Sequence, residues 1–303
     1  MSAFTDVAAE AVLLAGGGRA ILLQIADPAV GAGVARHSDF ANRPLDRFAK
    51  TVTYAYATVF GTAEELAVVV NRVNEAHRPV HSHSASTSPI DRVADHEVAD
   101  TGICAHAPDD EVTHDACGHE AQLEVAYDAF DREAQLWVAA TLYHSAITVY
   151  EKVFGALGQG EAEEVYRRYG VLGTSLQVHA GSWPADRRAF TQYWNDAMSH
   201  LDVSDDARRV ASDLLHPRTA PLWLRAAMPL VRLITAGLLT PELRRAFVLP
   251  WSTRHQRRFD RIFALTAVVY PRLPRRLRHL PKDHYLAALR QSVATERARS
   301  SAG

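Results

Sequence analysis

Cysteine is nearly absent from this sequence, which has only Cys104 and Cys117 among its 303 residues. Two cysteines cannot form the disulfide framework that stabilises small secreted domains. The sequence also lacks a basic segment before its first short apolar run, within residues 1–15, and this argues against a signal peptide. We therefore expect a cytoplasmic protein whose stability comes from an apolar core.

Long uninterrupted apolar runs are missing as well. The most apolar long stretch, residues 222–239, is interrupted by Arg225 and Arg232. Because a spanning helix needs about 20 predominantly apolar residues, this stretch is better interpreted as a core helix, and no transmembrane segment is expected. Apolar residues make up 48% of the chain, which is enough for a sizeable core.

The chain has no large excess of either charge, since its formal net charge is −2. Whole-chain charge therefore gives no reason to expect a nucleic-acid partner. The distribution is uneven: residues 81–121 hold nine acidic residues and one arginine, whereas residues 244–299 hold fourteen basic and three acidic residues. The basic region fits an anionic surface or cofactor, but a solvated helical face explains it more simply.

No segment alternates strictly between apolar and polar residues, so no sheet is expected, and no internal repeat is visible. The patterning predicts an all-α protein with one large domain spanning residues 1–303. One helix should run from Pro44 to Phe60 and end at Gly61. Thr62 should cap the next helix in a capping box with Glu65. Further helices are expected over residues 131–154, 161–172 and 184–201, after caps at Ser204 and Thr240, and as two arginine-rich helices between residues 253 and 299.

Residues 81–122 interrupt this helical pattern as a His- and Asp-rich loop or insertion. Seven of the fifteen histidines lie between residues 77 and 119. Thiolate and imidazole groups suit zinc, although their spacing matches no zinc-finger pattern. An acidic surface loop fits the same residues, and a disulfide between the two cysteines would need an oxidising compartment. The possible metal ligands are Cys104, His106, His114, Cys117 and His119.

His77 is the residue best placed for chemistry outside this insertion. Leu66, Val70, Val73 and His77 follow one another at i, i+4, i+7 and i+11, which places His77 on an apolar helix face. A neutral imidazole that faces an apolar cavity can bind haem iron. A core histidine that is hydrogen-bonded to a backbone carbonyl fits the same spacing.

The preceding helix carries a polar stripe with the same spacing, made of Arg47, Thr51, Tyr54 and Thr58. If this stripe lines a cavity, Arg47 could pair with a carboxylate, such as a haem propionate or an acidic substrate. Thr51 could then hydrogen-bond a bound oxygen species. The alternative is an ordinary solvated helix face.

Common catalytic signatures are missing from the chain. There is no serine-hydrolase elbow, no paired-carboxylate signature and no His-Glu-x-x-His motif. The glycine run at residues 16–18 lacks the third glycine of a dinucleotide-binding fingerprint, and no strand leads into it. Trp183, Tyr193 and Trp194 are expected to pack between helices rather than stack on bases.

A set of short segments follows a recognisable order along residues 10–290. It comprises Gly17-Gly18-Arg19-Ala20, Leu22-Leu23-Gln24-Ile25-Ala26, Pro28-Ala29-Val30, His37-Ser38-Asp39-Phe40, Pro44, Arg47, Thr51, Phe60-Gly61-Thr62, Val73, His77, Tyr127-Asp128-Ala129, Leu136-Trp137-Val138, Tyr193-Trp194 and Leu249-Pro250-Trp251. The ordered set resembles the haem-dependent oxygenase family of latex-clearing proteins (rubber oxygenases) and fungal mpaB-type oxygenases.

The resemblance implies a helical fold with a globin-like core, bound haem b, and an oxygenase that uses dioxygen on a small apolar or prenylated compound. It implies that His77 is the proximal haem ligand and that Arg47 and Thr51 lie near the haem. The chain departs from the family where Asp27 and Ala139 stand in place of histidines. His144 lies one turn beyond Ala140 on the same face. A haem- or ligand-binding protein without catalysis, and a metal-binding protein that uses the insertion, remain alternatives.

Overall fold

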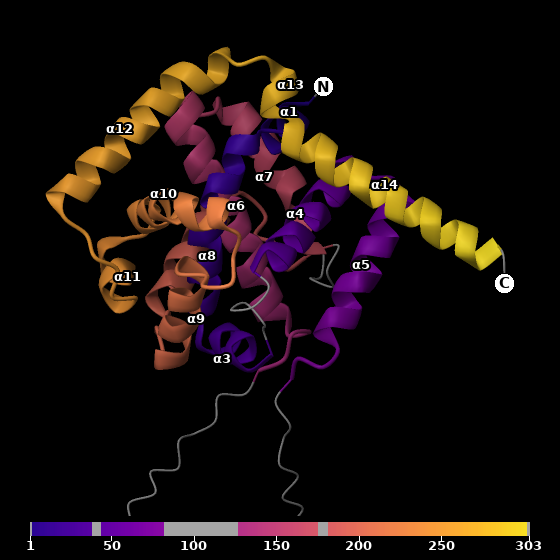
Figure 1. The fold of residues 1–303 in the computed structure, drawn as a ribbon, viewed down its shortest axis with the longest axis horizontal. Coiled ribbons are helices and arrows are strands. Elements are labelled where there is room, and N and C mark those ends of the chain that lie inside the picture. Colours follow the sequence, from indigo (N-terminus) through magenta and orange to yellow (C-terminus); the bar gives the residue numbers. More distant parts are fainter. Residues whose placement is uncertain (1, 38–43, 82–126, 175–180, 302–303) are drawn as a thin grey trace, which may run out of the picture.

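The structure is a computed structural model that describes residues 2–37, 44–81, 127–174 and 181–301, and within these residues the chain forms helices and no strand (Figure 1). The all-α prediction is therefore confirmed for the described part of the chain. The elements are α1 (Ala3–Ala8), the 3₁₀ helix η1 (Ala11–Gly16), α2 (Gly17–Ile25), α3 (Pro28–His37), α4 (Pro44–Phe60), α5 (Ala63–His77), α6 (Arg132–Phe154), α7 (Gln159–Thr174), α8 (Arg187–Ser199), α9 (Asp205–Leu215), α10 (Leu222–Leu238), α11 (Pro241–Ala246), α12 (Thr253–Val269), the 3₁₀ helix η2 (Tyr270–Arg272), α13 (Arg275–Arg278) and α14 (Leu280–Ser301).

Capping residues set the helix starts, largely where the sequence placed them. Thr62 accepts from the backbone N–H of Glu65 while the Glu65 carboxylate accepts from the N–H of Thr62, which completes the predicted capping box of α5. Ser204 caps α9, and Thr240 caps α11 with proline at the first position. α8 begins three residues later than expected, because Asp186 rather than the Pro184 region supplies its cap.

Helix α6 lies at the centre of the molecule, surrounded by η1, α2, α7 and α12 (Figure 1). It buries residues on several sides, among them Trp137, Tyr143, Val149 and Val153. A helix that is apolar on more than one face must be enclosed by other helices, and this explains why the longest helix of the structure is also the most central.

The apolar side chains form one large cluster and two smaller ones. The large cluster joins the N-terminal helices to α6 through α9, whereas a second cluster packs Val149 of α6 against Leu238 of α10 and Phe259 of α12. In the third, Tyr56 of α4 packs with Leu286 of α14. Helix α14 thereby lies as a strap along α4 and α5, and Arg290 donates to the Glu65 carboxylate at 3.0 Å.

Helix α10 differs from its expected place in the core. Its inner face buries Met228 and Thr235, but Leu222 and Trp223 are 79% and 66% exposed. The expectation that residues 222–239 form a core helix is therefore wrong for the first half of α10, because the exposed residues all lie within 222–231, whereas none of residues 232–239 is exposed. None of the described helices combines the length and apolar character needed to cross a membrane.

The glycine run at residues 16–18 allows η1 and α2 to approach their neighbours closely. A Cβ atom on Gly18 would lie 2.1 Å from Oγ1 of Thr235, which is fully buried in α10, and one on Gly16 would lie 3.0 Å from the Ser145 carbonyl of α6. The glycines therefore serve helix packing, in agreement with the exclusion of a nucleotide-binding fingerprint.

This packing gives a first prediction. Gly18→Ala should lower the free energy of unfolding by about 1–3 kcal/mol, because the added methyl group overpacks the contact between α2 and α10. Gly160→Ala is the matched control, since a Cβ there, in the first turn of α7, meets no atom within 4 Å. Urea unfolding should leave Gly160→Ala unchanged or slightly stabilised; equal stability of the two variants would contradict the packing argument.

Candidate functional site

His77 is the last residue of α5 and is half-buried. Its ring meets the Phe130 ring edge-on, with the two centroids 6.3 Å apart. Val70 and Val73, which precede it on the same helix face, pack against the large apolar cluster. The apolar stripe of the sequence is thus present, and His77 stands at its outer end rather than in the middle of the core.

The chain on either side of residues 82–126 comes together beside His77. His81 pairs with Asp128 in an isolated antiparallel bridge, and the Ala129 N–H donates to the Val80 carbonyl at 2.9 Å. Asp128 in turn accepts from the N–H of Phe130. These bonds fix the ring of Phe130 next to the end of α5, so the position of His77 is set by backbone pairing as well as by its own helix.

Helix α3 closes the same end of the molecule (Figure 1). A Cβ on Gly33 would lie 3.2 Å from the Tyr127 ring and 3.7 Å from Val80. The guanidinium of Arg36 lies 5.7 Å from the centroid of the Tyr127 ring. Aromatic, aliphatic and cationic groups are therefore gathered near the end of α5.

Helix α4 packs against α5, and Tyr54, Ala57 and Val69 share one buried cluster. The residues of the predicted polar stripe on α4 do not share one environment, since Tyr54 is buried whereas Thr51 is exposed. Arg47 lies in α4, but its side chain is outside the described part of the chain. The roles proposed for Arg47, Thr51 and His77 stay predictions.

The possible metal ligands of the insertion, from Cys104 to His119, all lie outside the described residues. The expected loop at residues 81–122 also lies outside the described residues, except for His81. Within the described ranges, no three histidine, cysteine, aspartate or glutamate side chains cluster as a metal site would require. The zinc alternative therefore stays a prediction.

A second polar centre lies deep between α2, α6 and α10, and it is organised by Arg19. This guanidinium is only 5% exposed. Its Nε donates to the Leu238 carbonyl at 2.9 Å, and its Nη1 donates to Oγ of Ser145 at 3.0 Å. Burial lowers the pKa of Arg19 to about 10, so the group stays charged at neutral pH.

No carboxylate within the described ranges pairs with Arg19, and the end of α10 takes that role. Leu238 is the last residue of α10, where unpaired carbonyls and the helix dipole concentrate negative charge. Sequence analysis assigned Arg19 no role, although one feature marks it: it is the only charged residue between Glu10 and Asp27. A lone arginine in such an apolar stretch must find its partners inside the protein.

His144 of α6 lies in the same centre. Its ring stacks on Trp194 with a centroid distance of 3.9 Å and an interplanar angle of 11°. Its Nδ1 lies 3.2 Å from Oγ1 of Thr148. Burial, together with the positive charge of Arg19, lowers the pKa of His144 to about 3. The imidazole is therefore neutral over the whole physiological range.

Buried hydrogen bonds connect this centre to the start of α6. The Gln24 amide donates to Oγ1 of Thr141 at 3.0 Å, and the Trp137 indole donates to the Leu23 carbonyl at 3.1 Å. The rings of Trp137 and Trp194 lie 5.3 Å apart. Trp183 and Trp194 thus pack between helices, as expected.

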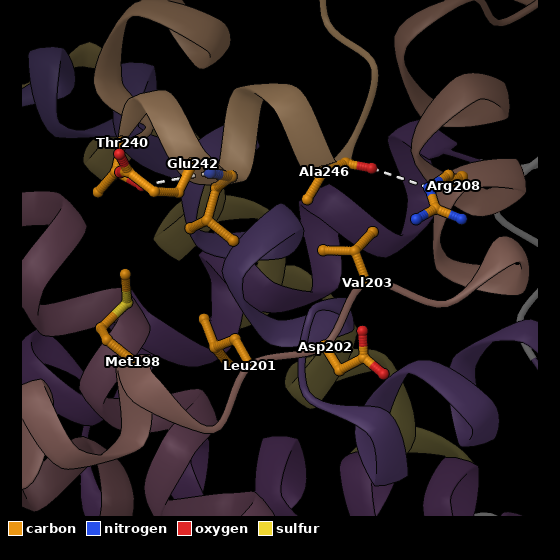
Figure 2. Close-up of a pocket in the computed structure, with 9 residues that line it drawn as sticks. Met198, Leu201, Asp202, Val203, Arg208, Thr240, Glu242 and Ala246 are labelled. Atoms are coloured by element: carbon orange, nitrogen blue, oxygen red, sulfur yellow. Dashed lines mark hydrogen bonds between the residues drawn. The ribbon is translucent and has the colours of Figure 1, made fainter.

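A surface hollow of about 320 Å³ lies between the end of α8, α9 and α11 (Figure 2). Its polar groups are occupied in holding helices together. Arg208 donates through Nε to the Ala246 carbonyl at 2.8 Å and pairs with Asp205, while Thr240 caps α11. Backbone and Thr240 hydrogen bonds lower the pKa of Glu242, which stands at the start of α11. The hollow therefore offers no converging set of free donors for a ligand.

Comparison with known proteins identifies the family of this chain. The family model described as ER-bound oxygenase mpaB/B'/Rubber oxygenase, catalytic domain, matches residues 5–268. The chain belongs to this family. Two proteins named as uncharacterised, Mb2261 of Mycobacterium bovis and Rv2237 of Mycobacterium tuberculosis, are each 31% identical to it over 261 residues, which cover 84% of this chain and 88% of theirs. No solved structure matches it significantly.

The two departures from the mpaB/rubber oxygenase pattern both have structural explanations. Asp27 accepts from the Val30 N–H at 2.9 Å and so caps α3, with Pro28 at the first helical position. Ala139 is 5% exposed and belongs to the large apolar cluster. Neither position carries an imidazole, so the histidines available to an oxygenase site among the described side chains include His77 and His144.

The pKa of His144 gives a prediction about pH. Because it lies near 3 in the folded protein and near 6.5 ordinarily, the unfolded chain binds a proton that the folded chain does not. The stabilisation is complete above pH 6.5 and is lost as the pH falls toward 3. Between pH 7 and 5, wild type should lose roughly 2 kcal/mol more unfolding free energy than His144→Phe, which keeps the stack on Trp194.

Urea unfolding at the two pH values measures this difference, and the carboxyl groups common to both proteins cancel. Equal losses in wild type and His144→Phe would show that His144 titrates normally and that its neutral state contributes nothing.

Proposed function

We propose that this protein is a haem b-dependent oxygenase that uses dioxygen to act on a small apolar or prenylated compound, with His77 as the proximal ligand. The match of residues 5–268 to an oxygenase catalytic domain carries the proposal. The position of His77 at the end of α5, beside Phe130, supports it in detail.

The donor set near His77 fits haem. An imidazole is a common axial ligand of haem iron, and His77 is half-buried, as a ligand at the edge of a core must be. Phe130, Val73 and Val80 supply apolar surface of the kind that packs on a macrocycle. Arg36 lies at the same end of the molecule. A cofactor with one apolar body and two carboxylates requires these three kinds of group together.

Bound haem iron would supply the oxygen chemistry itself. The residues of the chain would bind the haem and orient it. His77 holds the group through its imidazole, and the helix positions of Arg47 and Thr51 in α4, adjacent to α5, suit a propionate partner and a hydrogen-bond donor respectively. Phe130 restricts rotation of the His77 ring and keeps water from one of its edges.

Haem titration tests the assignment of His77. Purified His77→Ala, His144→Phe and wild type are each titrated with hemin, and Soret absorbance gives the affinity. His77→Ala should lose at least about a hundredfold in affinity, because an axial ligand bond is removed. His144→Phe is the matched control and should bind as wild type does.

Three outcomes separate the alternatives. Loss of the Soret band in His144→Phe with normal binding by His77→Ala would move the proximal ligand to α6 and overturn the assignment. Haem binding with no oxygen uptake on apolar and prenylated substrates would favour a non-catalytic haem protein, an alternative to which the missing histidines at Asp27 and Ala139 point. Stoichiometric zinc that is lost in Cys104→Ser/Cys117→Ser, with no Soret band, would support a metal-binding insertion instead.

A further inference from the structure

A corner of the molecule outside the site described above exposes an unusual set of aliphatic side chains. It lies where the end of α12 turns through η2 and α13 into α14, on the outer edge of the fold (Figure 1). Leu265 is 65% exposed and Leu277 is 52% exposed. The apolar corner consists of Leu265, Val268, Val269, Leu273, Leu277 and Leu280, all of them exposed.

Exposed arginines surround the apolar corner. Along α12, Arg261, Arg258 and Arg254 precede Leu265 by four, seven and eleven residues, so they continue the same helix face. Beyond α12, Arg272, Arg275 and Arg276 alternate with the leucines of the corner. None of these six forms an ion pair with a carboxylate of the described residues, whereas Arg72, Arg245 and Arg290 elsewhere do.

The corner is firmly attached to the body of the protein. Arg278 turns inward, pairs with the Glu10 carboxylate at 2.5 Å, and lies over the rings of Phe154 and Tyr270. The Val12 N–H donates to the Tyr270 hydroxyl at 3.1 Å. The exposed leucines and arginines are therefore presented on a fixed scaffold, so their exposure does not come from a loose end of the chain.

We propose that the apolar corner docks on an anionic lipid bilayer. Leucine and valine side chains that project from a helical surface can enter the boundary between headgroups and acyl chains, while arginines beside them meet anionic headgroups. Within the described residues the six arginines have no carboxylate partner, and an anionic surface would complement their charge. A polyanion in water would leave the aliphatic side chains of the corner exposed to water.

Two other occupants fit the corner less well. A single-stranded nucleic acid would be recognised by exposed aromatic rings, and none of the corner residues is aromatic. A duplex would engage the arginines through its phosphates but would leave the aliphatic side chains in water. A second copy of the chain packed about a two-fold axis would bring six identical arginines against each other, with only Asp260 and Asp283 as exposed acidic residues within α12, α13 and the first turn of α14. Most of the corner lies beyond residue 268, where the match to the oxygenase family ends, so this proposal does not depend on the haem site.

Vesicle sedimentation of the full chain tests the proposal. Wild type should sediment with phosphatidylcholine vesicles that contain phosphatidylglycerol and stay in solution with phosphatidylcholine alone. Arg275→Glu/Arg276→Glu should weaken partitioning by about 30-fold or more, because each basic residue near an anionic surface contributes a factor of roughly five. Leu273→Ser/Leu277→Ser should weaken it at least about tenfold through lost apolar burial.

Arg188→Glu/Arg209→Glu is the matched control: it changes the net charge equally but places the change on α8 and α9, away from α13 (Figure 1). It should bind nearly as wild type does. Failure of wild type to bind anionic vesicles, or an equal loss in the control, would overturn the proposal. The oligomeric state without lipid, measured by analytical ultracentrifugation, tests the remaining occupant. A wild-type dimer together with a Leu273→Ser/Leu277→Ser monomer would assign the corner to a second copy instead.

Discussion

The buried charge of Arg19 is the constraint on which the helical scaffold depends. Taking a guanidinium out of water is costly unless its donors find acceptors, and here the end of α10 accepts from Nε of Arg19 and the Ser145 hydroxyl of α6 accepts from Nη1. Three helices must therefore meet at one point. The absence of a side chain at Gly18 permits that meeting, because any Cβ there would collide with Thr235. The hydrogen bonds of Arg19 and the close approach at Gly18 thus require the same arrangement of α2, α6 and α10.

This arrangement reaches the candidate site through α6. The helix that carries Ser145 and His144 begins at Arg132, immediately after the segment that places Phe130 beside His77. The middle of α6 is thus fixed by the buried polar centre, and its first turn follows directly on the segment that places Phe130 beside His77. His144 is neutral because it is buried in the interior of the helical scaffold. His77 lies at the edge of that scaffold, which is the more accessible position for a large cofactor.

Local signals made much of the helical pattern predictable. Pro44 and Gly61 bound α4, and the reciprocal bonds of Thr62 and Glu65 begin α5, because caps act over a single turn and are visible in the sequence. Pro281 does not end a helix but lies in the first turn of α14, where a missing N–H costs nothing. The exposure of Leu222 and Trp223 could not be predicted, since periodicity shows which residues share a face but not what covers it.

The candidate site was predictable to the same extent. The place of His77 on an apolar face followed from spacing. The packing of α4 against α5, and the pairing of His81 with Asp128 that fixes Phe130 beside His77, depend on tertiary contacts that spacing does not show. The central claim, that residues 5–268 form a haem-binding oxygenase domain, is tested most directly by the ultraviolet–visible spectrum and iron content of freshly purified wild-type protein. The account predicts a Soret band and one iron per chain. Protein that lacks iron and gains no Soret band with added hemin would contradict it.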